Sequence, residues 1–238
     1  MQLLDLTLPT PAETLAGDEA LLNSCEACGG SALRFWESPT PFVVVGYGNI
    51  VASEVNLPAC GSVGVPVLRR CSGGGTVLQG PGCLNYTVVL EIAPEPALAT
   101  VTGTNHFILS CLARALSPLL DNAVTVQGDT DLVWRGRKFS GNAQRRRRTH
   151  LLFHGTVLLG MDLSLVEKFL RPPSREPAYR QARSHEEFIA NLPLSRDAVK
   201  RALAEAWQAN VTQAAWPEAE TQRLVRDYYS RAEWNQQR

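Results

Sequence analysis

Residues 69–82 have the sequence RRCSGGGTVLQGPG, with two arginines, a serine and then three consecutive glycines. Glycine loses more backbone entropy on folding than any other residue, so such a run indicates that something approaches the main chain closely. The β-rich stretches 65–70 and 84–92 predict strands on either side. Backbone N–H groups of such a loop can surround an anion, and the guanidinium groups of Arg69 and Arg70 suit phosphate or carboxylate. The stretch therefore predicts a phosphate-bearing ligand, with a ligand-free strand connection as the alternative.

Strands and helices are interspersed along the rest of the chain. Thr10 and Glu13 have the spacing of a capping box, with Pro11 at the first helical position. Periodicity of apolar residues predicts the other elements. We expect strands at 1–8, 31–38, 41–48, 65–70, 84–92 and 151–160, short strands over 124–144 with a turn at Gly136, a mobile loop at 171–191, and helices at 10–25, 106–120, 163–170, 196–210 and 218–234. Without strict β-α-β alternation, the predicted class is α+β, a mixed β-sheet flanked by helices in a single domain.

The overall composition excludes several classes of protein. The 238 residues are 45% apolar and 19% charged, which is ordinary for a globular protein. The formal net charge is zero, so no overall field attracts nucleic acid or anionic lipid. The first residues lack a basic segment followed by an apolar run, and no apolar run is long enough to span a membrane. We therefore expect a cytoplasmic protein with neither nucleic-acid nor membrane partners.

The six cysteines are expected to be free thiols, because the chain shows no secretion signal. Cys25 and Cys28 have a zinc-ligand spacing, but no second pair of ligands has a matching spacing. Gly29 and Gly30 follow directly, and glycine commonly ends a helix. A helix end is therefore favoured over a zinc site.

A second unusual stretch is GRKFSGNAQRRRRTHLLFHGTVLL at residues 136–159. A lone lysine is usually a solvated surface charge. Lys138, however, lies between a turn and the small residues Ser140 and Gly141, which indicates that another group comes close. On rigid β structure, a lysine is a suitable point charge for a phosphoryl or carboxyl oxygen.

Together these stretches resemble the lipoate–protein ligase A family, within the larger group of biotin and lipoate ligases. The matching motifs occur in the family's order over nearly the whole chain. They are Arg69-Arg70-x-Ser72-Gly73-Gly74-Gly75-x-Val77, Asp131-Leu132-Val133 followed by Gly136-Arg137-Lys138, Ser140-Gly141-Asn142-Ala143-Gln144, and His154-Gly155-Thr156-Val157-Leu158-Leu159. The resemblance implies the biotin/lipoate ligase catalytic domain, which is like that of class II aminoacyl-tRNA synthetases.

The resemblance also implies roles for individual residues. Lys138 would be catalytic and would contact both the acyl carbonyl and the phosphate of an acyl-adenylate. Arg70 and the glycine loop would hold the phosphate and ribose, with Asp131 near the nucleotide. For His154, a structural role is an equal alternative. The full set of expected ligand-binding residues is Arg70, Ser72, Gly73, Gly74, Gly75, Thr76, Val77, Leu78, Gln79, Asp131, Lys138, Ser140, Gly141, His154 and Gly155.

The implied reaction joins lipoate or octanoate to a lysine amine. Because a carboxylate is a poor electrophile, ATP first converts it to the mixed anhydride with AMP, and Mg²⁺ screens the triphosphate. Lys138 and the loop amides would offset the charge that develops on the reacting oxygens. The expected acceptors are lipoyl domains of 2-oxoacid dehydrogenase E2 subunits or the glycine cleavage H protein.

Three departures from the family pattern leave alternatives open. Gln79 replaces a common histidine and cannot carry a proton, which argues against a general base there. The run Arg145–Arg148 is either a solvated loop or a docking site for an acidic carrier domain. The sequence stops where many members begin a small accessory domain, so a separate accessory subunit, or transfer of a preformed acyl-adenylate, is an alternative.

The main alternative is ATP-independent octanoyl or lipoyl transfer through a catalytic cysteine. In one subgroup that cysteine precedes the lysine motif, and residues 121–133 contain none. In another it precedes the His-Gly strand, where this chain has Leu151. Cys71 and Cys83 match neither position and are predicted to be buried packing residues. A binding module without chemistry is a further alternative, which the intact glycine run and Lys138 disfavour.

Overall fold

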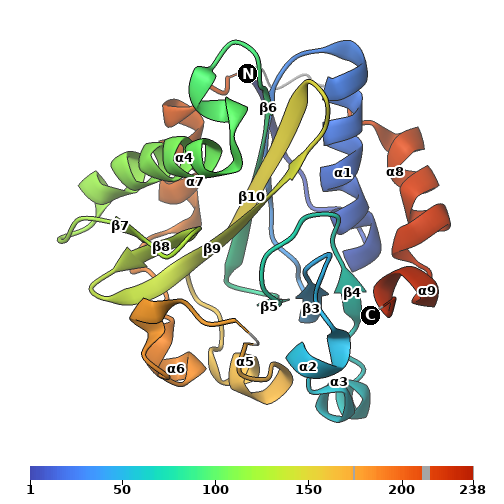
Figure 1. The fold of residues 1–238 in the computed structure, drawn as a ribbon, viewed down its shortest axis with the longest axis vertical. Coiled ribbons are helices and arrows are strands. Elements are labelled where there is room, and N and C mark those ends of the chain that lie inside the picture. Colours follow the sequence, from blue (N-terminus) through green and yellow to red (C-terminus); the bar gives the residue numbers. More distant parts are fainter. Residues whose placement is uncertain (174, 211–214, 238) are drawn as a thin grey trace.

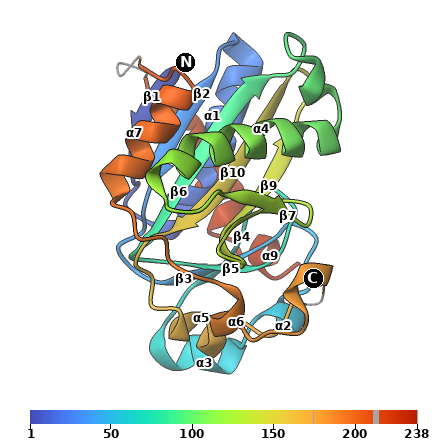
Figure 2. The same ribbon diagram turned by 90° about the vertical axis from the view of Figure 1, so that its left-hand side faces the viewer.

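The computed structural model describes residues 1–173, 175–210 and 215–237. Within this part of the chain, a seven-stranded sheet forms the centre and a three-stranded sheet lies beside it (Figure 1, Figure 2). The order in the large sheet is β1 (Gln2–Asp5), β2 (Ala32–Trp36), β6 (Cys83–Glu91), β10 (His150–Leu158), β9 (Arg137–Arg146), β8 (Asp131–Trp134) and β7 (Thr125–Gln127). The order in the small sheet is β4 (Val67–Arg69), β3 (Phe42–Val45) and β5 (Val77–Gln79). β1 and β2 are parallel and their neighbours in the large sheet are antiparallel, which confirms the predicted mixed sheet.

Helices cover both faces of the large sheet. They include α1 (Pro11–Cys28), α4 (Val101–Leu116), α7 (Arg196–Ala206) and α8 (Glu218–Leu224). α1 lies on one face with α8 outside it, whereas α4 and α7 lie on the other (Figure 1, Figure 2). On β6, Val88 packs in the core with α4 and α7, while Val89 packs with Leu21 and Leu22 of α1. Each strand thus places alternate residues on opposite faces, as strand geometry requires.

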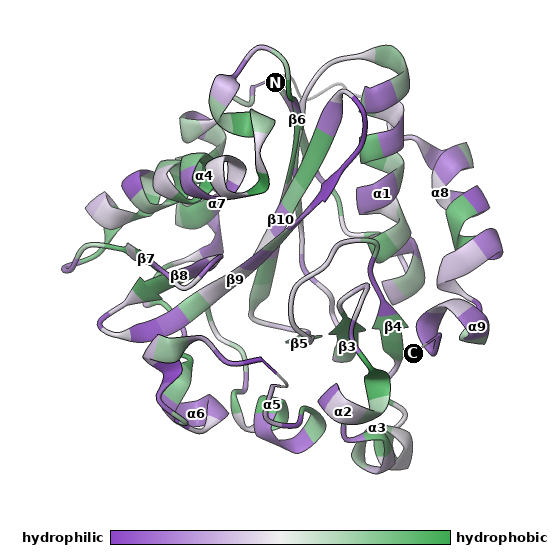
Figure 3. Ribbon diagram, viewed as in Figure 1, coloured by the Kyte–Doolittle hydropathy of each residue, from purple (hydrophilic) through white to green (hydrophobic). Residues whose placement is uncertain are grey.

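Short helices surround the small sheet. Those nearby are α2 (Val51–Glu54), α3 (Leu57–Val63), α5 (Ser164–Phe169) and α6 (His185–Phe188) (Figure 1). The remaining ones are η1 (Pro96–Ala99), η2 (Ser117–Leu119), η3 (Ala178–Arg180), the π-turn η4 (Val225–Tyr229) and α9 (Ala232–Asn235). β3 is strongly hydrophobic, whereas helices such as α1 mix both kinds of residue (Figure 3). No helix of the described residues is both long and apolar enough to cross a bilayer.

Elements with local sequence signals form where they were predicted. Thr10 and Glu13 form the capping box of α1, which ends at Cys28 before Gly29. This confirms a helix end at the cysteine pair, and within the described residues no group of three side chains is arranged to hold a metal. Arg135 and Gly136 both have positive φ and make the tight turn between β8 and β9, as expected at Gly136.

Other predicted boundaries were wrong. α4 begins at Val101 rather than 106, because Thr100 caps it and accepts a hydrogen bond from Gly103 N–H. The predicted helix 218–234 is divided into α8, η4 and α9. The predicted loop 171–191 contains η3 and α6, and Phe188 of α6 is buried in the cluster around the small sheet. Its mobility stays a prediction, and residue 174 lies outside the described residues.

Candidate active site

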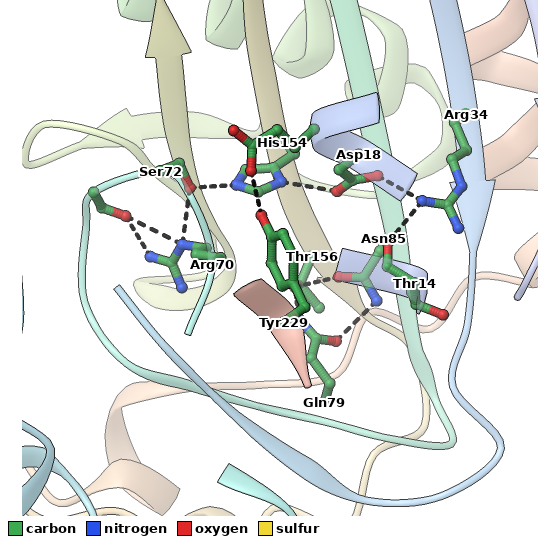
Figure 4. Close-up of polar contacts among 12 residues, drawn as sticks. Thr14, Asp18, Arg34, Arg70, Ser72, Gln79, Asn85, His154, Thr156 and Tyr229 are labelled. Atoms are coloured by element: carbon green, nitrogen blue, oxygen red, sulfur yellow. Dashed lines mark hydrogen bonds and ion pairs between the residues drawn. The ribbon is translucent and has the colours of Figure 1, made fainter. Parts of the chain in front are cut away.

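Polar side chains of three neighbouring strands form one row on the α1 side of the large sheet. Arg34 of β2 is paired with Thr87 of β6, and Thr87 with His154 of β10, so the three side chains share a face. Asp18 extends from α1 onto this row (Figure 4). Arg34 Nη1 donates to Asp18 Oδ1 at 2.7 Å, and His154 Nδ1 lies 3.0 Å from Asp18 Oδ2. A buried carboxylate is thus held between an arginine and a histidine.

His154 connects this ion pair to the glycine loop. Its Nε2 lies 2.6 Å from Ser72 Oγ, and Asp18, Arg34 and Ser72 are each no more than 1% exposed. Burial opposes ionisation of Asp18, but the hydrogen bond from His154 and the charge of Arg34 outweigh it, so the Asp18 pKa lies below its usual value. A continuous chain of contacts therefore runs from Arg34 to the loop.

Arg70 holds the glycine loop from inside. Its Nε donates to Ser72 Oγ at 3.0 Å (Figure 4). Its Nη2 donates to the carbonyls of Gly73 and Gly75 at 2.6 and 2.8 Å. Burial lowers the Arg70 pKa to about 10, which leaves the side chain charged at neutral pH. No hydrogen bond within the described residues uses Nη1, and Arg70 lines the cavity described below.

The glycines of the loop have different reasons for lacking a side chain. Gly74 has a φ of +83°, and a Cβ there would lie 3.0 Å from Arg70 Nη2. A Cβ at Gly73 or Gly75 would meet no atom of the described residues within 4 Å. The space beside these two glycines is therefore open to a ligand.

Arg69 has a different role from its neighbour. It is fully buried, and its Nη1 donates to three backbone carbonyls of the turn 46–49 over 2.8–3.1 Å. Its Nε donates to the carbonyl of Trp234 at 3.1 Å, and its own N–H donates to Asn235 Oδ1 at 2.9 Å. The expectation that Arg69 recognises phosphate is wrong, because the side chain holds α9 against the small sheet.

A second polar row lies next to the first. Asn85 of β6 is paired with Thr156 of β10, and Gln79 closes a ring with them (Figure 4). Gln79 Nε2 donates to Thr156 Oγ1 at 2.8 Å, Thr156 Oγ1 to Asn85 Oδ1 at 2.9 Å, and Asn85 Nδ2 to Gln79 Oε1 at 2.8 Å. Gln79 is thus part of a neutral ring of hydrogen bonds.

Lys138 lies on β9 and is held by several contacts. Its Nζ is 2.7 Å from Asp131 Oδ1, and Tyr179 donates its hydroxyl to Asp131 Oδ2 at 2.7 Å. The Lys138 carbonyl accepts a hydrogen bond from Ala190 N–H at 2.9 Å. A Cβ at Gly141 would lie 2.9 Å from Nζ. The small residue beside Lys138 is therefore required by the lysine's own side chain, which is 26% exposed.

Members of both polar rows, part of the glycine loop and Lys138 border one cavity of about 790 Å³. The predicted residues on its wall are Arg70, Gly74, Gly75, Thr76, Val77, Leu78, Gln79, Asp131, Lys138, Ser140, Gly141, His154 and Gly155. Of the other two, Gly73 borders a smaller adjoining cleft, and Ser72 lies under the loop. Cavity residues outside the quoted motifs include Leu15, Asp18, Trp36, Val44, Asn85, Val166, Leu170, Arg180, His185, Phe188 and Ile189.

The cysteines near the cavity do not provide a thiolate. Burial raises the pKa of both the Cys71 and Cys83 thiols to about 12. Both side chains are at most 4% exposed, as predicted for packing residues. At neutral pH they are protonated and weak nucleophiles.

Two members of the arginine run bind other parts of the chain. Arg146 Nη2 donates to the carbonyl of Leu98 at 2.6 Å, and Arg147 Nη2 donates to Glu19 at 3.0 Å. Arg145 lies over the ring of Tyr47, at 5.8 Å from its centroid. The solvated-loop alternative is therefore wrong for these residues, whereas Arg148 is exposed, and docking of an acidic carrier domain stays a prediction.

Comparison with known proteins identifies the family. The family model described as the lipoyl protein ligase A/B catalytic domain matches residues 10–208. The chain belongs to the lipoyl protein ligase A/B family. Lipoate-protein ligase A subunit 1 of Thermoplasma acidophilum is 28% identical over 250 residues, covering 97% of this chain and 95% of that relative. Octanoyltransferase LipM of Halalkalibacterium halodurans is 26% identical over 261 residues, covering 94% of each chain.

Solved structures of this family share the fold. The bi-partite lipoate protein ligase of Thermoplasma acidophilum, described with its E2 lipoyl domain, has a TM-score of 0.84 at 26% identity, covering 99% of this chain and 95% of that one. A lipoate-protein ligase A bound with ATP has a TM-score of 0.81 at 25% identity, covering 99% and 98%. The relatives thus include both ligases and an octanoyltransferase, and a lipoate-related ligase or transferase is the activity class they support.

Proposed function

We propose that the protein is a lipoate–protein ligase that attaches lipoate or octanoate, through an acyl-adenylate, to a lysine of a lipoyl domain. The observation that carries the proposal is that the open glycine loop and Lys138, far apart in sequence, border the same cavity. An anhydride of a fatty acid and AMP needs positive charge and N–H donors along its phosphate and carbonyl, and these two elements supply them.

The chemistry follows from the positions of three groups. Nη1 of Arg70 and the loop amides would bind the phosphate, and Lys138 would donate to both the acyl carbonyl and a phosphate oxygen. Asp131 holds the ammonium of Lys138 at 2.7 Å, so the charge is positioned before a ligand arrives. Preorganised charge of this kind stabilises the oxyanion without a reorganisation cost at the moment of reaction.

Apolar side chains on the cavity wall fit the two remaining parts of the ligand. Leu15, Trp36 and Val44 belong to one apolar cluster beside the first polar row, and would enclose the aliphatic chain. Leu170 and Phe188 belong to a different cluster, close to Lys138, and would contact the adenine. Apolar burial of both ends would leave the anhydride at the polar centre.

ATP and Mg²⁺ are the cofactors of the proposed reaction, and an ATP-bound relative supports the first of them. The cavity wall carries the carboxylates of Asp129, Asp131 and Glu176, but no three candidate ligands within the described residues are arranged around one point. The residues therefore fit a Mg²⁺ held mainly by phosphate oxygens and water rather than by a protein cage.

The proposed acceptors are lipoyl domains of 2-oxoacid dehydrogenase E2 subunits, or the glycine cleavage H protein. We propose that residues 1–238 act as one catalytic domain and that the protein works in the cytoplasm. A relative named subunit 1 and a bi-partite ligase support a separate accessory subunit as a further partner. In that case adenylate formation would need the second subunit, whereas transfer from a preformed acyl-adenylate would not.

Octanoyl transfer without ATP is the second candidate, favoured by the LipM relative. A thioester route needs a reactive thiolate near the acyl carbonyl. The buried, protonated Cys71 and Cys83 argue against that route in this chain. Replacing Cys71 with alanine is accordingly expected to leave acyl transfer within about threefold of the unmodified rate, since weak packing losses are all that is involved.

The test is to supply the unmodified lipoyl domain with each donor in turn and to measure its mass. An acyl increase that requires ATP, Mg²⁺ and free lipoate or octanoate supports the ligase. An increase only with octanoyl carrier thioester supports the transferase, and one only with lipoyl-AMP supports a missing accessory subunit. No increase with any donor would refute the proposed function.

Lys138→Ala is the decisive variant in the same assay. It is expected to lower transfer about 100-fold or more, because a donor to the developing negative charge is lost. Lys168→Ala, which removes an exposed lysine of α5, is the matched control and should behave like the unmodified protein. Equal rates for both variants would contradict the role of Lys138.

A further inference from the structure

The contacts from Arg34 to Ser72 allow a consistent direction of hydrogen bonding. Ser72 Oγ accepts a hydrogen bond from Arg70 Nε, so its own proton is available for His154 Nε2 at 2.6 Å. His154 then carries its ring proton on Nδ1 and donates it to Asp18, whose charge is held by Arg34. This arrangement of protons gives each of the contacts from Ser72 through His154 to Asp18 one donor and one acceptor.

This order of serine, histidine and aspartate is also that of a hydrolytic triad. Ser72, however, is 1% exposed and lies beneath the loop rather than on the cavity wall. Arg70 already donates to the hydroxyl oxygen that would have to attack. The hydroxyl is placed to hold the loop rather than to reach an acyl group.

The same contacts tie the loop to the rigid part of the fold. Arg70 joins Ser72 to the carbonyls of Gly73 and Gly75, so the loop is built around this hydroxyl. His154 lies in the middle of β10 at the centre of the large sheet, where it cannot move independently. The position of the loop glycines therefore depends on the buried His154, through Ser72 and Arg70.

We propose that Asp18, Arg34, Ser72 and His154 form a positioning relay that holds the glycine loop in the conformation that binds the nucleotide phosphate. The nucleotide part of this inference rests on the proposed function. The mechanical part, that the relay orders the loop, does not.

Two amide variants of His154 separate the halves of the relay. The amide of glutamine reaches about as far as Nε2 and can still accept from Ser72, whereas that of asparagine reaches about as far as Nδ1 and can still donate to Asp18. We expect His154→Gln to preserve loop order better than His154→Asn. Ser72→Ala should act like His154→Asn and leave the cavity wall unchanged, and the double variant Ser72→Ala/His154→Asn should add little, because both remove one contact.

His150→Gln is the matched control. His150 lies on the same strand and is also buried, but its ring contacts Thr149 Oγ1 at 2.9 Å and the Gly30 carbonyl at 3.1 Å, away from the loop. His150→Gln should leave the hydrogen exchange of residues 72–76 and the KM for ATP at the unmodified values.

Hydrogen exchange of the loop amides at residues 72–76 is the first measurement, because it needs no enzymatic activity. Ser72→Ala and His154→Asn are expected to raise exchange about tenfold or more, the size expected for one lost buried hydrogen bond. Unchanged exchange in both variants would overturn the relay, even if the protein proves to be a ligase. If exchange rises in both variants but the wild-type protein shows no acyl transfer with any donor, the relay stands and the proposed function is refuted.

The second measurement is the KM for ATP in the ligation assay. Ser72→Ala is expected to raise it about tenfold while the KM for octanoate changes less than about twofold, because the acyl slot is untouched. Equal changes in both KM values would overturn the link to the nucleotide. An octanoyl adduct on Ser72 of the wild-type protein, found by peptide mass, would also overturn it and make Ser72 the nucleophile.

Discussion

Asp18→Asn tests how much the buried ion pair between Asp18 and Arg34 stabilises the folded protein. The substitution preserves shape but removes the charge that faces Arg34, which is 0% exposed. Leaving one member of a buried ion pair without its partner costs about 3–5 kcal/mol. Arg34 keeps hydrogen bonds to the Leu6 and Thr14 carbonyls at 3.2 and 3.0 Å, and lies 4.9 Å from the ring centroid of Trp216. These contacts stabilise the remaining charge, so we expect the loss in the free energy of unfolding to lie at the lower end of that range, about 3 kcal/mol.

Urea unfolding followed by circular dichroism measures this loss in the free energy of unfolding. The free energy of unfolding of a domain is only about 5–15 kcal/mol, so the urea midpoint should shift strongly. Arg34→Met in the Asp18→Asn background removes the unpaired charge, and should recover at least about 1 kcal/mol. A loss below about 1 kcal/mol for Asp18→Asn, or no recovery in the double variant, would refute the assignment of the pair as a buried ionic contact.

The same pair predicts how stability depends on pH. The Asp18 pKa is lowered in the folded state, so its stabilising contribution is complete above the usual value of 3.8 and disappears as pH falls through the folded value. The difference in free energy between the wild-type protein and Asp18→Asn should therefore narrow at acid pH. A difference that stays constant from neutral to strongly acid pH would mean that the carboxylate is not the source of the effect.

Two further predictions concern packing and the C-terminal helix. Gly155→Ala should lower the free energy of unfolding by about 1–3 kcal/mol, because a Cβ would overlap the side-chain amide of Asn142. Gly160→Ala, where a Cβ meets no atom of the described residues within 4 Å, should be nearly neutral, and equal thermal midpoints for the two variants would contradict the close contact. Asn235→Ala should lower the free energy of unfolding by about 1–3 kcal/mol, because the buried N–H of Arg69 loses its acceptor, whereas replacing the exposed Gln236 with alanine should change it little. Both variants are compared by urea unfolding, and similar midpoints would show that Asn235 does not hold α9.

Local features of this protein were predictable because their causes lie within a few residues. The capping box at Thr10 and the tight turn at Gly136 depend on neighbouring backbone groups, and alternation of side chains indicated the strands. The glycine loop and Lys138 were recognisable because unusual residue types were concentrated there. Even so, the reason for Gly141 differs from the expectation, since it is the side chain of Lys138 itself that comes close.

The partners of His154 could not be predicted, although its possible place in the pocket was. Asp18 lies in a helix that gives no sign of a site, and Arg34 lies in a strand where a fully buried charge is unexpected. Their meeting depends on β2, β6 and β10 being neighbours in a particular register and on which face α1 covers. Arg69 and Arg70, adjacent in sequence, were likewise indistinguishable until one was found against α9 and the other inside the loop.

The amino-acid sequence by itself determined the class of fold, most local elements and the two stretches that border the cavity, because entropy, capping and periodicity act over short distances. Only the tertiary structure decided which charges are paired, which arginine serves the loop and which residues share the cavity. The physical reason is that buried charges are stable only beside partners, and strand register and helix packing bring those partners together from distant parts of the chain.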